Sequence, residues 1–364
     1  MTETATMFDR LISTGVFDTA KANLTKPEKN FVLLGPEGSG LEELLANTYT
    51  QETRNAMFQE GYLVTAVREF STPETPQDVF KTLYRDARNA LDAALSSNLH
   101  TSSVLTALSA QAFSDELLNS FDLGTAKSTF DAFVTQLKTA GYTTIFVYTE
   151  WERLVFPDSG SVKKGLNEIY GALRAVSQAG NAFFVVTTPY GLVYPNPLVQ
   201  SDFIDSFRPF WTFPKLTCAQ MRSLIEPFLQ PDWPYSPEDI CNILLFWTGG
   251  NLKLTTYFLQ SLRDHSGDLV AMEDDWYGPT TTDLKTHCNH MMERWCSYLD
   301  RLAVWNVDTI LHTVVTQEQV FESNGLSYLE QIGLISYDET NYTHNCCEAL
   351  ALYVESKHSI TPEI

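Results

Sequence analysis

Short apolar runs alternate with longer amphipathic segments in the first half of the chain. Four of these runs have the length and composition of buried strands: FVLL (31–34), GYLVTAVREF (61–70), TTIFVY (143–148) and AFFVVTTP (182–189). Between them, apolar residues recur at helical spacing in LEELLANTY (41–49), PQDVFKTLYRDARNALDAAL (76–95), STFDAFVTQLKTAGY (128–142) and VKKGLNEIYGALRAVSQAGN (162–181). Strands that are apolar on both faces and alternate with helices predict a parallel sheet covered on two sides.

The pattern becomes helical after Pro214. Three helices are predicted: TCAQMRSLIEPFL (217–229), SPEDICNILLFWTGGN (236–251) and LKLTTYFLQSLRDH (252–265). Ser236 and Asp239 have the spacing of an N-terminal capping pair in front of an apolar run. The acidic stretch MEDDWYGPTTTD (272–283) is predicted as a turn and as a domain boundary.

The last part of the chain combines helices with a hairpin. Helices are predicted over LKTHCNHMMERWCSYLDRLAVW (284–305), VDTILHTVV (307–315) and TQEQVFESN (316–324). A further helix, a strand at 334–337, a turn and a return strand follow within GLSYLEQIGLISYDETNYTHN (325–345). This order of helices and hairpin predicts a winged helix.

The composition is acidic: 24 basic residues stand against 45 acidic ones in 364, for a formal net charge of -21. A large sequence-independent DNA contact is disfavoured, because phosphate contacts need clustered Lys and Arg. The segment TQEQVFESNGLSYLEQIG (316–333) of the predicted winged helix contains neither. No apolar run reaches the length of a membrane span and the N-terminus does not resemble a secretory signal, so we expect an intracellular protein, cytoplasmic or nuclear.

Six cysteines all lie in the second half, without a C-x-x-C pair, which is typical of reduced thiols. The densest group of metal-binding side chains is HCNHMMERWC (287–296). Its spacing matches no common zinc pattern. We therefore expect a helix with packed and surface residues there, and no metal site.

The stretch FVLLGPEGSGLEELLA (31–46) has the order strand, glycine-rich turn and helix. In a phosphate-binding loop, glycines let backbone N–H groups converge on phosphate oxygens, a lysine neutralises the phosphates, and a Ser or Thr hydroxyl binds Mg²⁺. This chain keeps the glycines but has Leu41 at the lysine position and Glu42 at the hydroxyl position. The candidate nucleotide-binding residues of the loop are Gly35, Pro36, Glu37, Gly38, Ser39, Gly40, Leu41 and Glu42.

Three later segments suit the same kind of site. IFVYTEWERL (145–154) is a strand that would end in Asp-Glu in a P-loop ATPase, and here Thr149 and Glu150 hold those two positions. FFVVTTP (183–189) is a strand that ends in the polar residue Thr188. TGGNLKL (248–254) opens a helix that carries Lys253.

In this order, the segments resemble the AAA+ and STAND-type ATPases, including archaeal-type ATPases and origin-recognition or Cdc6-like initiators. The resemblance implies an α/β P-loop AAA+ domain over residues 1–214, with a parallel sheet and helices on both faces. It further implies a helical lid over 215–271 and a winged-helix domain over 272–364.

The resemblance also implies roles for single residues. Thr188 would face the γ-phosphate, Lys253 would replace a sensor arginine, and Glu150 would be the remaining catalytic residue. The substitutions at Leu41, Glu42 and Thr149 remove three contacts to Mg-ATP, so ATP and Mg²⁺ are disfavoured as ligands.

Each of these residues also has a structural interpretation. Glu42 and Glu43 suit the first turn of any helix, where a carboxylate contributes about 0.3–1 kcal/mol, although they would repel phosphates there. Glu150 is equally well explained as a strand-end carboxylate with a structural bond, and Lys253 as an exposed helix residue.

Three functions stay open at this point. The first is a degenerate pseudo-ATPase that acts as a scaffold or interaction subunit beside protein partners, such as related AAA+ subunits, and is not an enzyme. The second is an active but atypical ATPase switch that uses Glu150 and Lys253. The third is a DNA-binding initiator or transposition-type subunit that uses the winged helix, an analogy of fold only.

Overall fold

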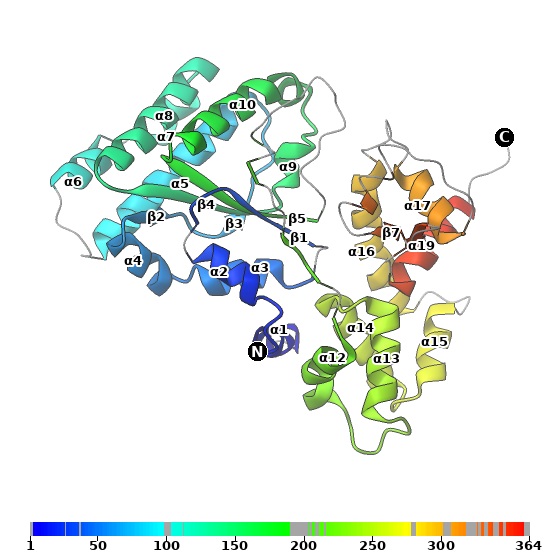
Figure 1. The fold of residues 1–364 in the computed structure, drawn as a ribbon. Helices are drawn as coiled ribbons and strands as arrows, with labels where there is room; N and C mark the ends of the chain where they lie inside the picture. Colours follow the sequence, from blue (N-terminus) through cyan, green and yellow to red (C-terminus); the bar gives the residue numbers. More distant parts are fainter. Residues whose placement is uncertain are drawn as a thin grey trace, which may run out of the picture.

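A parallel sheet forms the centre of the first part of the computed structural model (Figure 1). Its strands are β1 (Phe31–Leu34), β2 (Tyr62–Val64), β3 (Arg68–Glu69), β4 (Thr143–Thr149), β5 (Ala182–Thr188) and β6 (Trp211–Thr212). The order is β2-β4-β5-β1-β6, with β3 also paired to β4, and these pairings are all parallel. All residues of β1 and β4 are buried, as expected for strands covered on both faces.

The structure describes the following residues: 3–25, 27–35, 38–97, 103–111, 113–189, 203, 206–207, 211–214, 216–277, 282–300, 307–317, 326, 329–330, 334–337, 342–344 and 347–359.

Helices cover the two faces of the sheet (Figure 1). One face carries α2 (Asp18–Leu24), α3 (Leu41–Thr48) and α4 (Gln51–Gln59), and the other carries α5 (Pro76–Ser96), α8 (Leu123–Thr139) and α10 (Gly160–Gln178). The chain moves along the sheet in one direction from β1 to β2 and in the opposite direction from β2 through β4 to β5. Right-handed crossovers therefore place the two sets of helices on opposite faces. The predicted α/β architecture is confirmed.

The predicted strand over residues 61–70 is divided into β2 and β3. Thr65 interrupts it, because its N–H donates to the carbonyl of Ile145 at 2.9 Å while its hydroxyl accepts from the N–H of Val147 at 3.0 Å. The Thr65 hydroxyl thus replaces a backbone carbonyl as the hydrogen-bond acceptor beside β4. Periodicity alone does not reveal such a substitution.

Short helices complete this part of the chain. They are α1 (Glu3–Ser13), α6 (Ser103–Ala110), α7 (Asp115–Asn119) and α9 (Glu152–Val155). The sequence pattern did not predict α1, α2, α4 or α9. In α1, Met7, Phe8 and Leu11 are buried, and this helix packs against α12 and α14 of the following region.

The helical region contains α12 (Cys218–Ile225), a 3-10 turn η1 (Glu226–Phe228), α13 (Pro237–Thr248), α14 (Leu252–Asp264) and α15 (Leu269–Tyr277). The capping pair is confirmed: Asp239 N–H donates to the Ser236 hydroxyl at 3.2 Å and the Asp239 carboxylate accepts from Ser236. The prediction of a turn from Met272 onward was wrong, because residues up to Tyr277 belong to α15. Met272 and Trp276 are spaced four residues apart and give this helix a buried face.

The last region contains α16 (Asp283–Asp300), α17 (Val307–Val315), an antiparallel pair of β7 (Ile335–Tyr337) and β8 (Tyr342–His344), and α19 (Glu348–Ser359). The predicted hairpin is therefore present. Most of the predicted helix over 316–324 lies outside the described residues. The winged helix stays a prediction. Among the helices that the structure describes, none is long and apolar enough to cross a membrane.

A buried polar cluster joins α5 to the edge of the sheet. Asp86 accepts a hydrogen bond from the hydroxyl of Tyr148 on β4 and forms an ion pair with Arg68 on β3. Burial raises the pKa of the Asp86 carboxyl, and the Tyr148 hydrogen bond and the Arg68 charge oppose that shift. The carboxylate therefore depends on both partners to remain charged in the folded protein.

We expect Tyr148→Phe to lower the free energy of unfolding at pH 8 by about 1–3 kcal/mol, because Asp86 loses a buried donor. Because the pKa of Asp86 is raised in the folded protein, its protonated form favours folding. This contribution to the free energy of unfolding is complete below the unfolded pKa of 3.8, and it is lost as pH rises through the folded pKa. The variant raises the folded pKa further, so its deficit should shrink toward pH 5. Urea unfolding at both pH values measures this. An equal deficit at both would contradict it, and Tyr62→Phe is the control.

Candidate functional site

The candidate loop leaves the carboxyl end of β1 at a position where open α/β sheets bind ligands. Strand β1 lies between β5 and β6 in the sheet. The chain runs in one direction along the sheet from β1 to β2, and in the opposite direction from β5 to β6. Such a reversal creates a crevice beyond the strand ends. Pro36 and Glu37 of the loop lie outside the described residues.

The glycines of the loop have the conformation that the motif requires. Gly38 has a φ of +78° and Gly40 a φ of +92°, backbone angles that residues other than glycine rarely adopt. Gly40 is the residue before α3, and no side chain caps that helix end. Gly35 donates its N–H to the carbonyl of Thr188 at 3.3 Å, which fixes the start of the loop against β5. The predicted strand, loop and helix are therefore present.

Leu41, at the lysine position, is part of the hydrophobic core. It is 4% exposed, and its Cδ1 lies 2.8 Å from the position that a Cβ on Gly35 would occupy. The Cβ of Phe213, just after β6, lies 3.1 Å from the same position. A leucine here thus fills the space beside the end of β1.

Two helices from other regions press against the loop. The Cδ1 of Leu252 on α14 and the Cδ2 of Phe8 on α1 each lie 3.0 Å from the Cβ position of Gly40. Phe17 continues this apolar layer, with ring centroids 5.8 Å from Phe8 and 6.0 Å from Phe213. The layer spans α1, the loop and the end of β6.

The first turn of α14 is bonded to the loop itself. Lys253 donates its backbone N–H to the carbonyl of Gly38 at 3.2 Å. Its Cβ lies 2.6 Å from the Cβ position of Gly38, and the Oδ1 of Asn251 lies 3.0 Å from that position. Asn251 caps α14 by accepting from the N–H of Leu254 at 3.0 Å. Gly38 is therefore required both by its backbone angle and by the close approach of α14.

Phe8, Asn251 and Leu252 were missed by the sequence analysis. Phe8 has a weak signal, because Met7, Phe8 and Leu11 form a short stripe at helical spacing. Asn251 is also recognisable as the residue before an amphipathic helix. Their contact with the loop is long-range, and nothing in the local sequence indicates it.

The polar residues of the loop lie in contrasting surroundings. Ser39 is 1% exposed, and its hydroxyl has no hydrogen-bond partner among the described residues. Glu42 is exposed and Glu43 half-buried in the first turn of α3. The structural interpretation of Glu42 and Glu43 as first-turn residues agrees with this placement.

Glu150 takes part in a cluster of charges beyond the end of β4. It has φ +54, and its carboxylate forms an ion pair with Arg153. The Arg153 guanidinium also lies 3.2 Å from a carboxylate oxygen of Glu69 and donates to the carbonyl of Phe70 at 3.3 Å. The cluster ties the end of β4 to β3, which matches the structural interpretation of Glu150.

Thr149 and Thr188 are buried at the ends of their strands, with 4% and 2% exposure. The carbonyl of Thr149 accepts from Phe70 N–H at 2.8 Å, and that of Thr188 accepts from Gly35. The fold thus brings Thr149, Thr188 and the loop to the same edge of the sheet. Thr149, which the motif comparison placed at the position of the aspartate, is thus a buried residue.

The histidines and cysteines of α16 that could bind a metal differ in their exposure to solvent. Cys288 and Cys296 are buried, whereas His287 and His290 are exposed. His287 stacks on Tyr257 at 4.8 Å between ring centroids. Across the described part of the chain, no three His, Cys, Asp or Glu residues lie close enough together to hold a metal ion.

Comparison with known proteins gives likeness of structure only. No protein-family model and no curated protein matches the chain. Among solved structures, a Walker-type ATPase of Pyrococcus abyssi has 11% identity and a TM-score of 0.49, over 89% of this chain and 90% of that one. The Orc1 protein of Aeropyrum pernix in complex with DNA has 14% identity and a TM-score of 0.41, over 96% and 92%. Cdc6p from Pyrobaculum aerophilum has 11% and 0.38, over 96% and 94%.

These similarities concern the fold and not the activity. The fold predicted from the motifs is confirmed by the chain's own geometry: a parallel sheet between two helical layers, with a glycine loop joining β1 to α3 at the point of reversal. The chain therefore has the α/β fold of the P-loop proteins.

Proposed function

We propose that this chain is a degenerate pseudo-ATPase that serves as an interaction subunit of a larger complex. The observation that carries the proposal is the contact between α14 and the loop, where Lys253 N–H bonds to Gly38 and Leu252 packs on Gly40. The loop has become a joint between the sheet and the helical region. Its backbone groups and glycine surfaces contribute to folding.

The residues at this edge do not suit Mg-ATP. Leu41 supplies no positive charge and Thr149 no carboxylate, so the β- and γ-phosphates and Mg²⁺ lose the side chains that usually hold them. Glu42 and Glu43 add negative charge in the first turn of α3. These carboxylates would repel phosphates, although the water around the exposed Glu42 weakens that repulsion. Glu150 is engaged by Arg153.

We expect the purified protein to hydrolyse no ATP above the rate of a blank, alone or with co-purifying proteins. Glu150→Gln is the matched control, since it removes the remaining carboxylate at the position of the catalytic base without changing side-chain size. Phosphate release measured with a coupled assay decides the question. Turnover that Glu150→Gln abolishes would establish the atypical ATPase switch instead.

A surface on the helical region supports the interaction part of the proposal. Three large apolar side chains are exposed there: Phe246 on α13 (56%) and Val270 and Tyr277 on α15 (59% each). The rings of Phe246 and Tyr277 both pack against the buried Trp247, with centroids 5.9 and 5.7 Å from its ring. Exposed apolar groups clustered in this way are typical of protein contacts.

The charges of three carboxylates act on Tyr277. Partial burial raises the pKa of Tyr277, and the charges of Glu348, Glu273 and Glu355 raise it further. This combination of aromatic and acidic groups is complementary to a basic segment of a protein partner and would repel DNA phosphates. We therefore assign the surface to a basic protein partner.

The test is affinity purification of the tagged full-length protein from its own cells. We expect Phe246→Ser with Tyr277→Ser to lose the main co-purifying protein, because both rings leave the contact. The matched control is Val104→Ser with Leu117→Ser, two exposed apolar residues (56% and 46%) on α6 and α7. Equal recovery of the partner with both double variants would remove this surface from the proposal.

We propose an intracellular setting, without choosing between cytoplasm and nucleus, because the five cysteines that the structure describes are all free thiols. Burial raises the pKa of Cys241 to about 12 and that of Cys347 to about 11. Both thiols therefore stay protonated and unreactive at neutral pH.

A further inference from the structure

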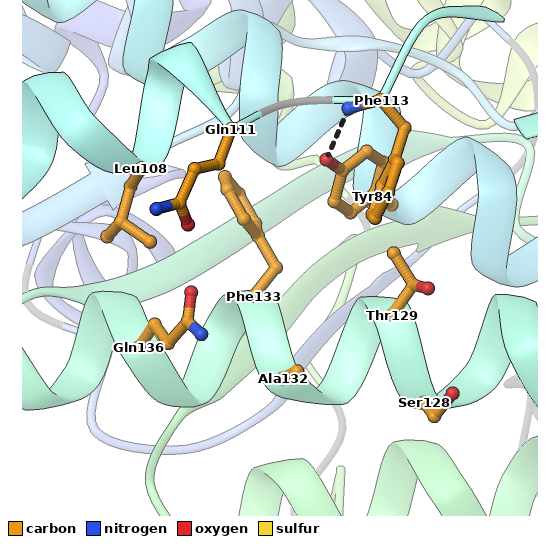
Figure 2. A pocket seen from close by; sticks show the side chains of 9 residues that line it. All are labelled: Tyr84, Leu108, Gln111, Phe113, Ser128, Thr129, Ala132, Phe133 and Gln136. Carbon is orange, nitrogen blue, oxygen red and sulfur yellow. Dashed lines mark hydrogen bonds between the residues drawn. The ribbon is translucent and has the colours of Figure 1, made fainter. Parts of the chain in front are cut away.

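Helices α5 and α8 lie on the opposite face of the sheet from α3 (Figure 1). A pocket of about 400 Å³ lies between them and α6 (Figure 2). Its volume falls in the range of small-molecule sites. None of the residues discussed for the loop or for the surface around Tyr277 lines it. The pocket is thus separate from the site described above.

Aromatic rings form one wall of the pocket. Tyr84 from α5 and Phe133 from α8 contact each other edge to face, with centroids 5.0 Å apart. The ring centroid of Phe113 lies 6.2 Å from that of Tyr84 and 5.3 Å from that of Phe121. Such mutual contacts fix ring orientation before any ligand arrives.

The backbone of Phe113 is also held in place. Its N–H donates to the hydroxyl of Tyr84 at 3.3 Å (Figure 2), and its carbonyl accepts from the guanidinium of Arg88 at 2.9 Å. Two side chains of α5 thus hold Phe113 in place, although this residue is 37% exposed. Two hydrogen bonds thus hold a partly exposed aromatic residue in a fixed position. A residue held in this way would lose little conformational freedom when a ligand binds against it.

Uncharged polar groups line the rest of the pocket: the amides of Gln111 and Gln136 and the hydroxyls of Ser128 and Thr129. Ser128 donates to the carbonyl of Thr125 at 3.1 Å. Within the described residues, the side chains of Gln111, Thr129 and Gln136 form no hydrogen bond, so they can donate to and accept from a ligand. Among the lining residues that the structure describes, there is no Asp, Glu, Lys, Arg or His.

We propose that this pocket binds a small, neutral, planar aromatic molecule that carries a hydrogen-bonding edge. The ring would lie against Phe113, the exposed residue of this aromatic wall, and the polar edge would meet the two glutamines. A charged ligand is disfavoured because the lining offers no opposite charge to replace its lost hydration. The chain's net charge of -21 disfavours an anion further.

The probe is benzamide, compared with benzoate, which has the same ring and a charge, and with cyclohexanecarboxamide, which has the same amide and no aromatic ring. Saturation-transfer NMR on the full-length protein would detect binding with a Kd on the order of 1 mM, typical of so small a ligand. We expect benzamide to bind at least about ten times more tightly than either analogue, the factor that about 1.4 kcal/mol represents.

Two variants locate the binding. Ala132→Trp should abolish the benzamide signal, since Ala132 is an exposed residue of α8 that lines the pocket and a tryptophan would fill it. Asp131→Trp, one residue earlier on the same helix and outside the lining, should retain the signal. No benzamide binding to the wild type, equal binding of the three probes, or a signal that survives in Ala132→Trp would each overturn the proposal.

Discussion

Replacing Leu41 with lysine, the residue that an active phosphate loop has at this position, is expected to lower the free energy of unfolding by about 3 kcal/mol. The side chain is 4% exposed and packs beside Gly35 and Phe213, so an ammonium group there would lose its hydration. Restoring the motif should therefore damage the protein instead of restoring ATP binding.

Urea unfolding of Leu41→Lys, with and without Mg-ATP, measures this result. Leu41→Met is the control, because a swap that conserves apolar volume usually costs less than about 1.5 kcal/mol. A lysine variant as stable as the wild type, or one stabilised by Mg-ATP, would mean that the loop has kept room for phosphates.

Gly38→Ala is the second substitution with a large expected effect, a loss of about 2–4 kcal/mol. The left-handed conformation, φ +78, costs about 1–2 kcal/mol for an alanine. The new Cβ would also lie 2.6 Å from the Cβ of Lys253, so α14 would have to move away from the loop.

Two matched substitutions separate these contributions. Gly141→Ala has a positive φ of +96 but no atom within 4 Å of the new Cβ, so it should show the backbone cost alone. Gly171→Ala lies inside α10 with open space and should be neutral or stabilising by up to about 1 kcal/mol. Equal losses for Gly38→Ala and Gly141→Ala would show that α14 exerts no constraint on the loop. Chemical denaturation of the three variants decides this.

The strands and long helices of the sheet domain were predictable because each has a clear local period. β4 and β5 are continuous apolar runs, and α5 carries a helical stripe that includes Val79, Phe80 and Leu83. Thr65 and α15 were misread for a local reason, since a side-chain hydroxyl can replace a carbonyl and a polar sequence can still bury one face.

The composition of the loop was predictable, but its role in packing was not. Gly35, Gly38 and Gly40 indicated a tight turn, and Leu41 indicated a lost charge. That Phe8 and Leu252 cover Gly40 depends on contacts between residues more than 30 positions apart, which no local period encodes. The ion pair of Glu150 and Arg153 could not be predicted from helical spacing, because Glu150 precedes α9 and has a φ of +54.

Equilibrium dialysis of radiolabelled ATP with Mg²⁺ against the purified protein tests the central claim most directly, which is that the loop is a structural joint. We predict no saturable binding up to about 1 mM ATP, an affinity no better than about -4 kcal/mol. One ATP bound per chain with a Kd well below that concentration, and lost in Gly40→Val, would contradict the claim, because the loop would then hold phosphates despite Leu41 and Glu42.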